Sequence, residues 1–258
     1  MEHVTSSDGT RIAYERSGSG TPLVLVHGTS VEHFTFRFVE PLLSDRFTLY
    51  SIDRRGRGES GDSASGYAIE QEFADIASLV DSLAEPADVF GHSYGASVAL
   101  GAATLARNLR RLVLYEPALG VTQETPEFLA RLDALLAEDQ REQLLSIFLA
   151  EAGLDPDALE QLRASPVWPG RVAAAHTITR ELRAEESYQP DPEALSLHSI
   201  PVLLLLGSES PEWAKKGTAL VQSLLTDSRV AVLEAEGHIA ILTAPELVAD
   251  QVVRFLGE

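Results

Sequence analysis

Cysteine is absent from this chain of 258 residues, so disulfides, thiolate nucleophiles and cysteine-ligated zinc sites are excluded. Long apolar runs are also missing, since none approaches the roughly 20 residues that span a bilayer. Positive charge is scarce: 20 lysines and arginines stand against 39 aspartates and glutamates, for a formal net charge of −19. This imbalance disfavours nucleic acid, anionic membranes and polyanionic substrates, because such partners need clustered cations.

The segment 1–20, MEHVTSSDGTRIAYERSGSG, is polar and acidic, whereas a signal peptide needs a basic start followed by an apolar segment. We therefore expect a cytoplasmic protein that acts on a small molecule, without nucleic acid or a membrane as partner. The sequence carries no signal for an oligomeric state.

Short apolar runs alternate with longer amphipathic segments over most of the chain. Runs such as LVLV, LVLY and VLLLL are apolar on both faces, as in parallel strands covered by helices on both sides. We expect strands at 11–15, 22–26, 47–52, 87–90, 111–115, 202–206 and 229–233, and helices at 69–83, 94–106, 213–225 and 245–256. This alternation is typical of an α/β fold.

The alternation stops between residues 118 and 198, where no strand pattern occurs. Thr125-Pro126 and Asp155-Pro156 each join a capping residue to a first-turn proline and indicate helix starts. We expect three or four helices here, inserted between two core strands. The predicted domains are a core of residues 1–117 and 199–258 and a helical insertion at 118–198.

A serine lies between two glycines in the segment VFGHSYGASVALGAA, residues 89–103. An apolar run precedes it and a helical pattern follows, so Ser93 falls on a strand-to-helix turn. Such a turn presses neighbouring backbones together, which requires small residues at Gly91 and Gly95. The start of the helix directs free N–H groups toward a developing oxyanion. We predict that Ser93 is a nucleophile and that the N–H of Tyr94 is one oxyanion donor.

Two further candidates follow strands that end at the same edge of the expected sheet, where open α/β sheets bind ligands. His27-Gly28-Thr29 follows the strand at 22–26, and the N–H of Thr29 is the candidate second oxyanion donor. His238, in EAEGHIAILTAPE, lies between the last strand and the last helix and is the candidate base. Four other histidines, His3, His33, His176 and His198, lack such a placement, and His92 lies inside the turn that carries Ser93. We expect no catalytic role for these five.

Four motifs, in this order, resemble the α/β-hydrolase fold family: VHGTS at the oxyanion loop, DRRGRGES at 53–60, GHSYG at the nucleophile and GH at 237–238. The resemblance covers essentially the whole chain. It implies a mostly parallel eight-stranded sheet flanked by helices, with a helical cap between strands 6 and 7. It also implies chemistry that needs no metal or organic cofactor.

The third member of the catalytic triad departs from the family pattern. Most members carry an aspartate three residues after the glycine that ends strand 7, and here that position is Ser210, which cannot stabilise a histidine cation. Glu116, at the tip of the neighbouring strand, resembles the acid of haloalkane dehalogenases and certain lactone hydrolases. We predict Glu116 as the acid, with Glu209 as the main alternative and Glu212, or no acid, as further ones.

These residues predict a serine hydrolase of a small, largely neutral carboxylic ester or lactone, which reacts through an acyl-enzyme on Ser93. The alternatives on the same triad are a cofactor-free lyase, a carbon–carbon bond hydrolase, a perhydrolase, or a ligand-binding receptor with slow or no turnover. Dehalogenase and epoxide hydrolase chemistry is disfavoured, because both need an aspartate nucleophile. The candidate pocket residues are Gly28, Phe148, Trp168 and His176, and Tyr94 should border the site because it follows the nucleophile.

Overall fold

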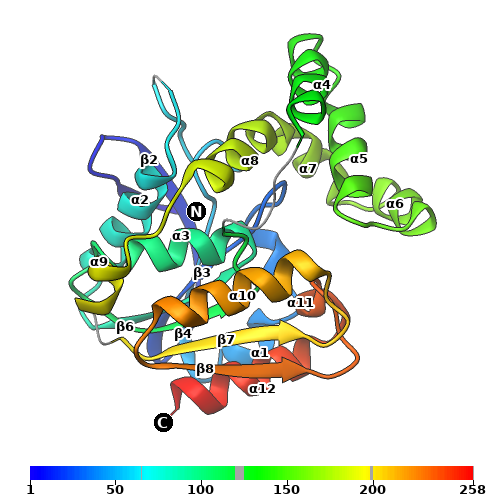
Figure 1. Ribbon diagram of the computed structural model, residues 1–258. Coiled ribbons are helices and arrows are strands. Elements are labelled where there is room, and N and C mark those ends of the chain that lie inside the picture. Colours follow the sequence, from blue (N-terminus) through cyan, green and yellow to red (C-terminus); the bar gives the residue numbers. More distant parts are fainter. Residues whose placement is uncertain (65, 120–124, 198–199, 258) are drawn as a thin grey trace.

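A twisted sheet of eight strands forms the centre of the computed structural model, which describes residues 1–64, 66–119, 125–197 and 200–257 (Figure 1). The strands are β1 (Glu2–Thr5), β2 (Arg11–Gly18), β3 (Thr21–Val26), β4 (Phe47–Ile52), β5 (Ala87–His92), β6 (Leu109–Tyr115), β7 (Val202–Gly207) and β8 (Ser228–Leu233). Their order in the sheet is β1-β2-β4-β3-β5-β6-β7-β8. β2 is antiparallel to β1 and β4, and all other neighbouring pairs are parallel. The strands from β3 to β8 therefore all end at one edge.

The expected α/β fold with a mostly parallel eight-stranded sheet is confirmed, and all seven strands expected from the sequence pattern are present. The pattern missed β1, whose residues are mostly exposed. β1 pairs only with β2 and lies at the end of the sheet. Because such a strand needs few apolar residues, its sequence EHVT carries little alternation that could reveal it.

Helices cover both faces of the sheet (Figure 1). One face carries α2 (Ile69–Ser82), α3 (Tyr94–Ala102) and α10 (Glu212–Leu224), and the other carries the 3-10 helix η1 (His33–Phe36), α1 (Glu40–Leu43), α11 (Ala240–Thr243) and α12 (Pro245–Leu256). Along β3, Val24 and Val26 belong to the first apolar core, while Leu23 and Leu25 belong to the second. Because side chains alternate along a strand, each central strand supplies both cores, which explains the unbroken apolar runs.

Six α-helices lie between β6 and β7 in the described part of the chain: α4 (Pro126–Ala137), α5 (Arg141–Glu151), α6 (Pro156–Arg163), α7 (Trp168–Ala174), α8 (Ile178–Ser187) and α9 (Pro192–Leu197), with the 3-10 helix η2 (Ala175–Thr177) before α8. The expected number, three or four, is too low, because α7 and α9 are too short to show a helical period. Both predicted helix starts are present: Thr125 accepts from the N–H of Phe128 at 3.1 Å, and Asp155 accepts from that of Asp157 at 2.9 Å.

We call the helices of 126–197 the cap, and α4 to α7 project from one end of the sheet (Figure 1). The cap has an apolar cluster of its own, in which Leu132, Leu144, Leu145 and Ile178 are fully buried. Within the described residues, none of the helices is long and apolar enough to cross a membrane.

Candidate active site

Ser93 occupies the turn between β5 and α3, with φ 58° and ψ −126°, a backbone conformation that is uncommon for a residue with a side chain. Its N–H donates to the carbonyl of Tyr115 at 2.9 Å, which holds the turn against β6. A Cβ atom at Gly91 would lie 2.5 Å from the carbonyl oxygen of Gly95, and one at Gly95 would overlap the carbonyl of Val26. The two glycines therefore allow β3, β5 and α3 to pack closely enough to hold Ser93 in this conformation.

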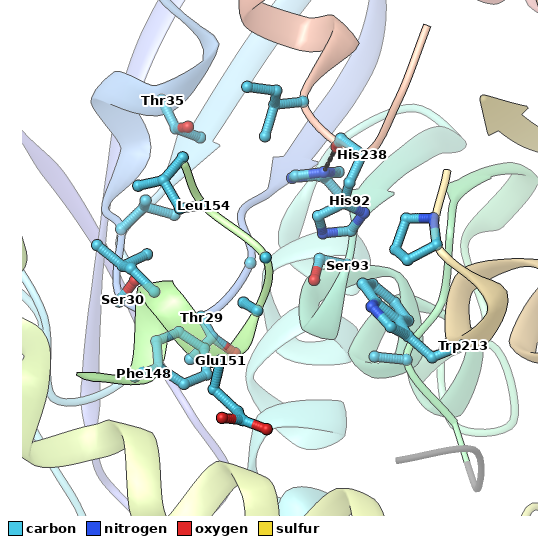
Figure 2. Close-up of a pocket in the computed structure, with 18 of the residues that line it drawn as sticks. Thr29, Ser30, Thr35, His92, Ser93, Phe148, Glu151, Leu154, Trp213 and His238 are labelled. Atoms are coloured by element: carbon cyan, nitrogen blue, oxygen red, sulfur yellow. Dashed lines mark hydrogen bonds between the residues drawn. The ribbon is translucent and has the colours of Figure 1, made fainter. Parts of the chain in front are cut away.

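His238 follows β8, and its Nδ1 lies 2.6 Å from Oε2 of Glu116, the residue after β6. Glu116 is fully buried, and its other oxygen, Oε1, accepts from the N–H of Gly207 at 2.8 Å and from the hydroxyl of Ser210. An ionised carboxylate can only accept hydrogen bonds, so Nδ1 of His238 carries a proton and Nε2 is left as an acceptor. Figure 2 shows Ser93 and His238 at the same end of a cavity.

Ser210 and Glu209 clarify which carboxylate belongs to this arrangement. Ser210, where the family pattern has an aspartate, is buried and donates its hydroxyl to Glu116 instead. Glu209 is exposed, and it forms no hydrogen bond to His238 among the described residues. Glu212 is also distant from this role, since its carboxylate accepts from Lys215 at 3.3 Å. The geometry therefore favours Glu116 over both alternatives.

The loop that carries His238 is fixed by aromatic and imidazole side chains. His92 donates from Nε2 to the carbonyl of His238 at 2.8 Å, and the hydroxyl of Tyr115 donates to the carbonyl of Gly237. Trp213 makes an edge contact with the His238 ring, with ring centroids 4.7 Å apart. Burial, with a smaller contribution from His238, lowers the pKa of His92 to about 3, so this ring stays neutral at physiological pH. His92 was not among the residues predicted for the site, although its place next to Ser93 in the sequence was the available signal.

The loop after β3 passes beside the nucleophile. A Cβ atom at Gly28 would lie 3.0 Å from Cβ of Ser93 and 3.5 Å from its Oγ, so glycine lets the loop approach the site. Nη1 of Arg54 donates to the carbonyls of Gly28 and His27 at 3.0 and 3.3 Å and holds the loop from behind. The N–H groups of Thr29 and Tyr94 form no hydrogen bond within the described residues, so both remain available to a ligand.

The side chain of Tyr94 points away from the site, contrary to expectation. It is fully buried, and its hydroxyl lies 2.6 Å from that of Tyr67, while the guanidinium of Arg54 lies 4.5 Å from the centre of its ring. Only the backbone of Tyr94 is therefore placed to meet a substrate, because the first turn of α3 directs the side chain into the core.

A cavity of about 540 Å³ opens above Ser93, between the core and the cap (Figure 2). Gly28 and Phe148, two of the pocket candidates, line it, together with Thr29 and His238. Most of the remaining lining is apolar: Val31, Ala118, Leu149, Ala152, Leu154, Leu182, Pro211, Trp213, Ile239, Ile241 and Leu242. The cavity therefore joins a polar floor on the core to apolar walls.

Two predictions about this cavity are wrong. Trp168 is buried in the apolar cluster of the cap, because α7 turns it toward the cap interior. His176 lines a separate hollow, where its Nδ1 donates to the carbonyl of Ala173 at 2.8 Å and its Nε2 lies 3.8 Å from Asp62. His198 lies outside the described residues. In the described part of the chain, no group of three or more His, Asp or Glu side chains could hold a metal ion.

A buried ionic cluster joins the cap to the core beside the loop after β3. Nε of Arg54 donates to Glu72 at 2.7 Å, and Nη2 donates to Glu181 of α8 at 2.5 Å. Arg57 also donates to Glu181, and burial lowers the pKa of Arg57 to about 9. All four side chains are buried. Since Arg54 also holds the loop carbonyls, the position of the cap is coupled to the loop beside the nucleophile.

The other residues of the DRRGRGES motif shape its turn. Asp53 accepts from Nδ1 of His33 at 2.7 Å and from the N–H of Glu59 at 3.0 Å. A Cβ atom at Gly58, whose φ is 49°, would overlap the Asp53 carboxylate. Arg55 pairs with Asp75 through Nε at 2.8 Å. These contacts fix the turn.

Comparison with known proteins identifies the family to which this site and fold correspond. The model of the alpha/beta hydrolase family matches residues 23–251, so the chain belongs to that family and is a hydrolase. The crystal structure of an alpha/beta hydrolase from Sphaerobacter thermophilus is 36% identical, with a TM-score of 0.86, and the match covers 99% of this chain and all of that one.

Two curated relatives give functional names. A 2-(acetamidomethylene)succinate hydrolase from Mesorhizobium japonicum is 27% identical over 93% of this chain and 89% of its own length. A soluble epoxide hydrolase from Corynebacterium is 34% identical over 49% of this chain, and the matched segment spans 45% of that protein. The family is thus clear, whereas these names differ in reaction and substrate.

Proposed function

We propose that this protein hydrolyses small carboxylic esters or lactones through an acyl-enzyme on Ser93. The observation that carries the proposal is the 2.6 Å contact between His238 Nδ1 and the buried Glu116 carboxylate, next to a serine held in a strained turn. A nucleophile, a base and an orienting acid in this order are what acyl transfer requires. An epoxide hydrolase of this fold needs an aspartate where this chain has Ser93.

The proposed reaction starts with transfer of the Ser93 proton to Nε2 of His238 while Oγ attacks the substrate carbonyl. The charge of Glu116 stabilises the resulting imidazolium. The N–H groups of Thr29 and Tyr94 donate hydrogen bonds to the oxyanion. His238 then protonates the leaving alcohol, and the acyl group remains on Ser93 until a water molecule, deprotonated by His238, releases the acid.

The cavity supports a small substrate. Its volume of about 540 Å³ falls within the range of roughly 300–1,000 Å³ that is usual for small-molecule sites. The apolar walls suit a medium-sized acyl or lactone ring. The Mesorhizobium relative, a 2-(acetamidomethylene)succinate hydrolase, also supports a small-molecule substrate.

A labelling experiment with an ester panel tests this function. Wild-type protein, Ser93→Ala and the exposed control Ser223→Ala are treated with a fluorophosphonate probe and assayed on 4-nitrophenyl esters and γ-lactones of increasing chain length. We expect labelling of the peptide that contains Ser93, and turnover of at least one ester, in wild type and the control but not in Ser93→Ala. Labelling without turnover of any substrate would overturn the proposed hydrolase activity and support a lyase or a binding protein. Absence of labelling would refute the assignment of Ser93 as the nucleophile.

A further inference from the structure

An arginine of the cap reaches the catalytic cavity and is only partly satisfied there. Arg171 lies on α7 and lines the cavity, and its Nε donates to the carbonyl of Ser30 at 3.1 Å. Within the described residues, its terminal nitrogens form no hydrogen bond or ion pair. The side chain is half-buried, and burial, together with the neighbouring Arg37, lowers its pKa to about 10. The guanidinium is therefore charged at neutral pH and has no carboxylate partner in the part of the chain that is described.

Such an arginine is suited to an anion. A partly desolvated charge without a partner is unfavourable, and a planar guanidinium binds a carboxylate through two parallel hydrogen bonds. Two hydroxyl-bearing residues, Ser30 and Thr35, line the same cavity, and both are buried. Oγ of Ser30 has no hydrogen-bond partner among the described residues. Figure 2 shows Ser30 and Thr35 on the opposite side of the cavity from Trp213.

The arginine is connected to the reacting centre by the loop after β3. Gly28 of this loop contacts Ser93, Thr29 is the candidate oxyanion donor, and Ser30 accepts the hydrogen bond from Arg171. A substrate carbonyl bound between Ser93 and Thr29 would therefore have Arg171 beside its acyl chain.

The acidic residues of the cavity limit how much negative charge a substrate can carry. Glu151, Glu185 and Glu209 also line the cavity. The carboxylates of Glu151 and Glu209 disfavour a substrate with several negative charges, whereas one guanidinium can offset a single one.

Building on the proposed function, we propose that Arg171 binds a carboxylate on the acyl part of the substrate, so that the preferred substrates are monoesters or lactones derived from dicarboxylic acids. This replaces the neutral acyl group expected from the sequence. A single carboxylate remains compatible with the strongly acidic chain, because it needs one well-placed guanidinium rather than a cluster of cations.

A matched pair of esters tests the proposal. 4-Nitrophenyl hemiadipate carries a carboxylate where 4-nitrophenyl 6-methylheptanoate carries an isopropyl group of similar size. We expect wild type to prefer the hemiadipate in kcat/KM, and Arg171→Gln to lower kcat/KM for it by about 10- to 100-fold, mainly through KM, with little change for the neutral ester. Arg171→Lys, which keeps the charge, should retain part of the preference. Arg183 is an exposed cap residue that pairs with Asp133. Arg183→Gln removes the same charge as Arg171→Gln, so it serves as the control and should behave as wild type.

Binding to the inactive Ser93→Ala variant separates the anion site from catalysis. Isothermal titration calorimetry with monomethyl adipate should show binding that is lost in Ser93→Ala/Arg171→Gln and retained in Ser93→Ala/Arg183→Gln. If wild type hydrolyses neither ester, the proposed function fails, and the calorimetry alone decides on the anion site. The proposal is refuted if Arg171→Gln lowers kcat/KM equally for both esters, if wild type prefers the neutral ester, or if monomethyl adipate does not bind to Ser93→Ala.

Discussion

Replacing Glu116 with glutamine should leave the protein folded and remove most of its activity. The substitution keeps the shape of the side chain, but the hydrogen bonds around it dictate how an amide would orient. Gly207 N–H and the Ser210 hydroxyl both donate toward Oε1, so the amide oxygen must take that side and the NH2 group must face Nδ1 of His238. Nδ1 then has to accept, and the ring is held in the tautomer whose proton is on Nε2.

A histidine in that tautomer cannot take the proton of Ser93. The expected loss in kcat is on the order of 10³- to 10⁴-fold, as for removal of the orienting acid in other triads. This corresponds to about 4 to 5.5 kcal/mol of transition-state stabilisation. The free energy of unfolding should change much less, because volume and most hydrogen bonds of the side chain are retained.

The assay is kcat on any ester that wild type turns over, measured for Glu116→Gln and for Glu209→Gln as the matched control. Glu209→Gln should stay close to wild type, since Glu209 is exposed and the His238 contact belongs to Glu116. In the double variant Glu116→Gln/Ser210→Asp, part of the lost kcat should return, because Ser210 already touches the Glu116 carboxylate. If Glu116→Gln remains near wild type while Glu209→Gln collapses, the assignment of the acid is refuted.

Three further predictions concern stability. Gly95→Ala should lower the free energy of unfolding by about 1 to 3 kcal/mol in a denaturant titration, because the new Cβ overlaps backbone carbonyls at the end of β3. Gly237→Ala is the control and should change this free energy little, because no atom lies within 4 Å of the new Cβ. Equal effects of the two substitutions would contradict the packing argument. The hydrogen bond to Asp53 raises the pKa of His33, so its stabilising contribution is full below the unfolded value of about 6.5 and is lost as pH rises through the folded pKa. His33→Asn should therefore cost more unfolding free energy at about pH 5.5 than at about pH 9, and a pH-independent difference would exclude this pairing. Glu181→Gln should destabilise the protein by about 3 to 5 kcal/mol, because it leaves the buried Arg54 and Arg57 without their shared carboxylate. An unchanged midpoint of thermal unfolding would show that the ionic cluster does not hold the cap.

The sheet and the placement of Ser93 and His238 could be predicted from sequence because parallel strands impose strong local patterns. Buried strands such as β3 and β7 are apolar on both faces, and their carboxyl ends meet at one edge, so residues that follow them must converge. Glu116 could be proposed for the same reason, at the tip of β6. The sequence left open whether Glu116 or Glu209 is the acid, because that depends on side-chain directions in a loop. The hydrogen bonds from Ser210 and Gly207 to Glu116 favour Glu116.

The cavity walls were predicted less well because they depend on how cap helices pack against the core. Helical spacing does not reveal that α7 turns Trp168 inward while it presents Arg171 to the cavity. The side chain of Tyr94 was misplaced for a similar reason, since adjacency to Ser93 fixes its backbone but not its side chain.

The most direct test of the central claim, that Ser93 becomes acylated, is a rapid-mixing experiment with 4-nitrophenyl acetate combined with mass spectrometry of the acid-quenched protein. We predict a burst of nitrophenolate close to one equivalent per active site, and an added acetyl group on the peptide that contains Ser93, both absent in Ser93→Ala. The contradicting result would be steady turnover without a burst that still depends on His238 and Glu116, with Ser93 free of an acyl group at every quench time. Ser93 would then not be acylated during the reaction.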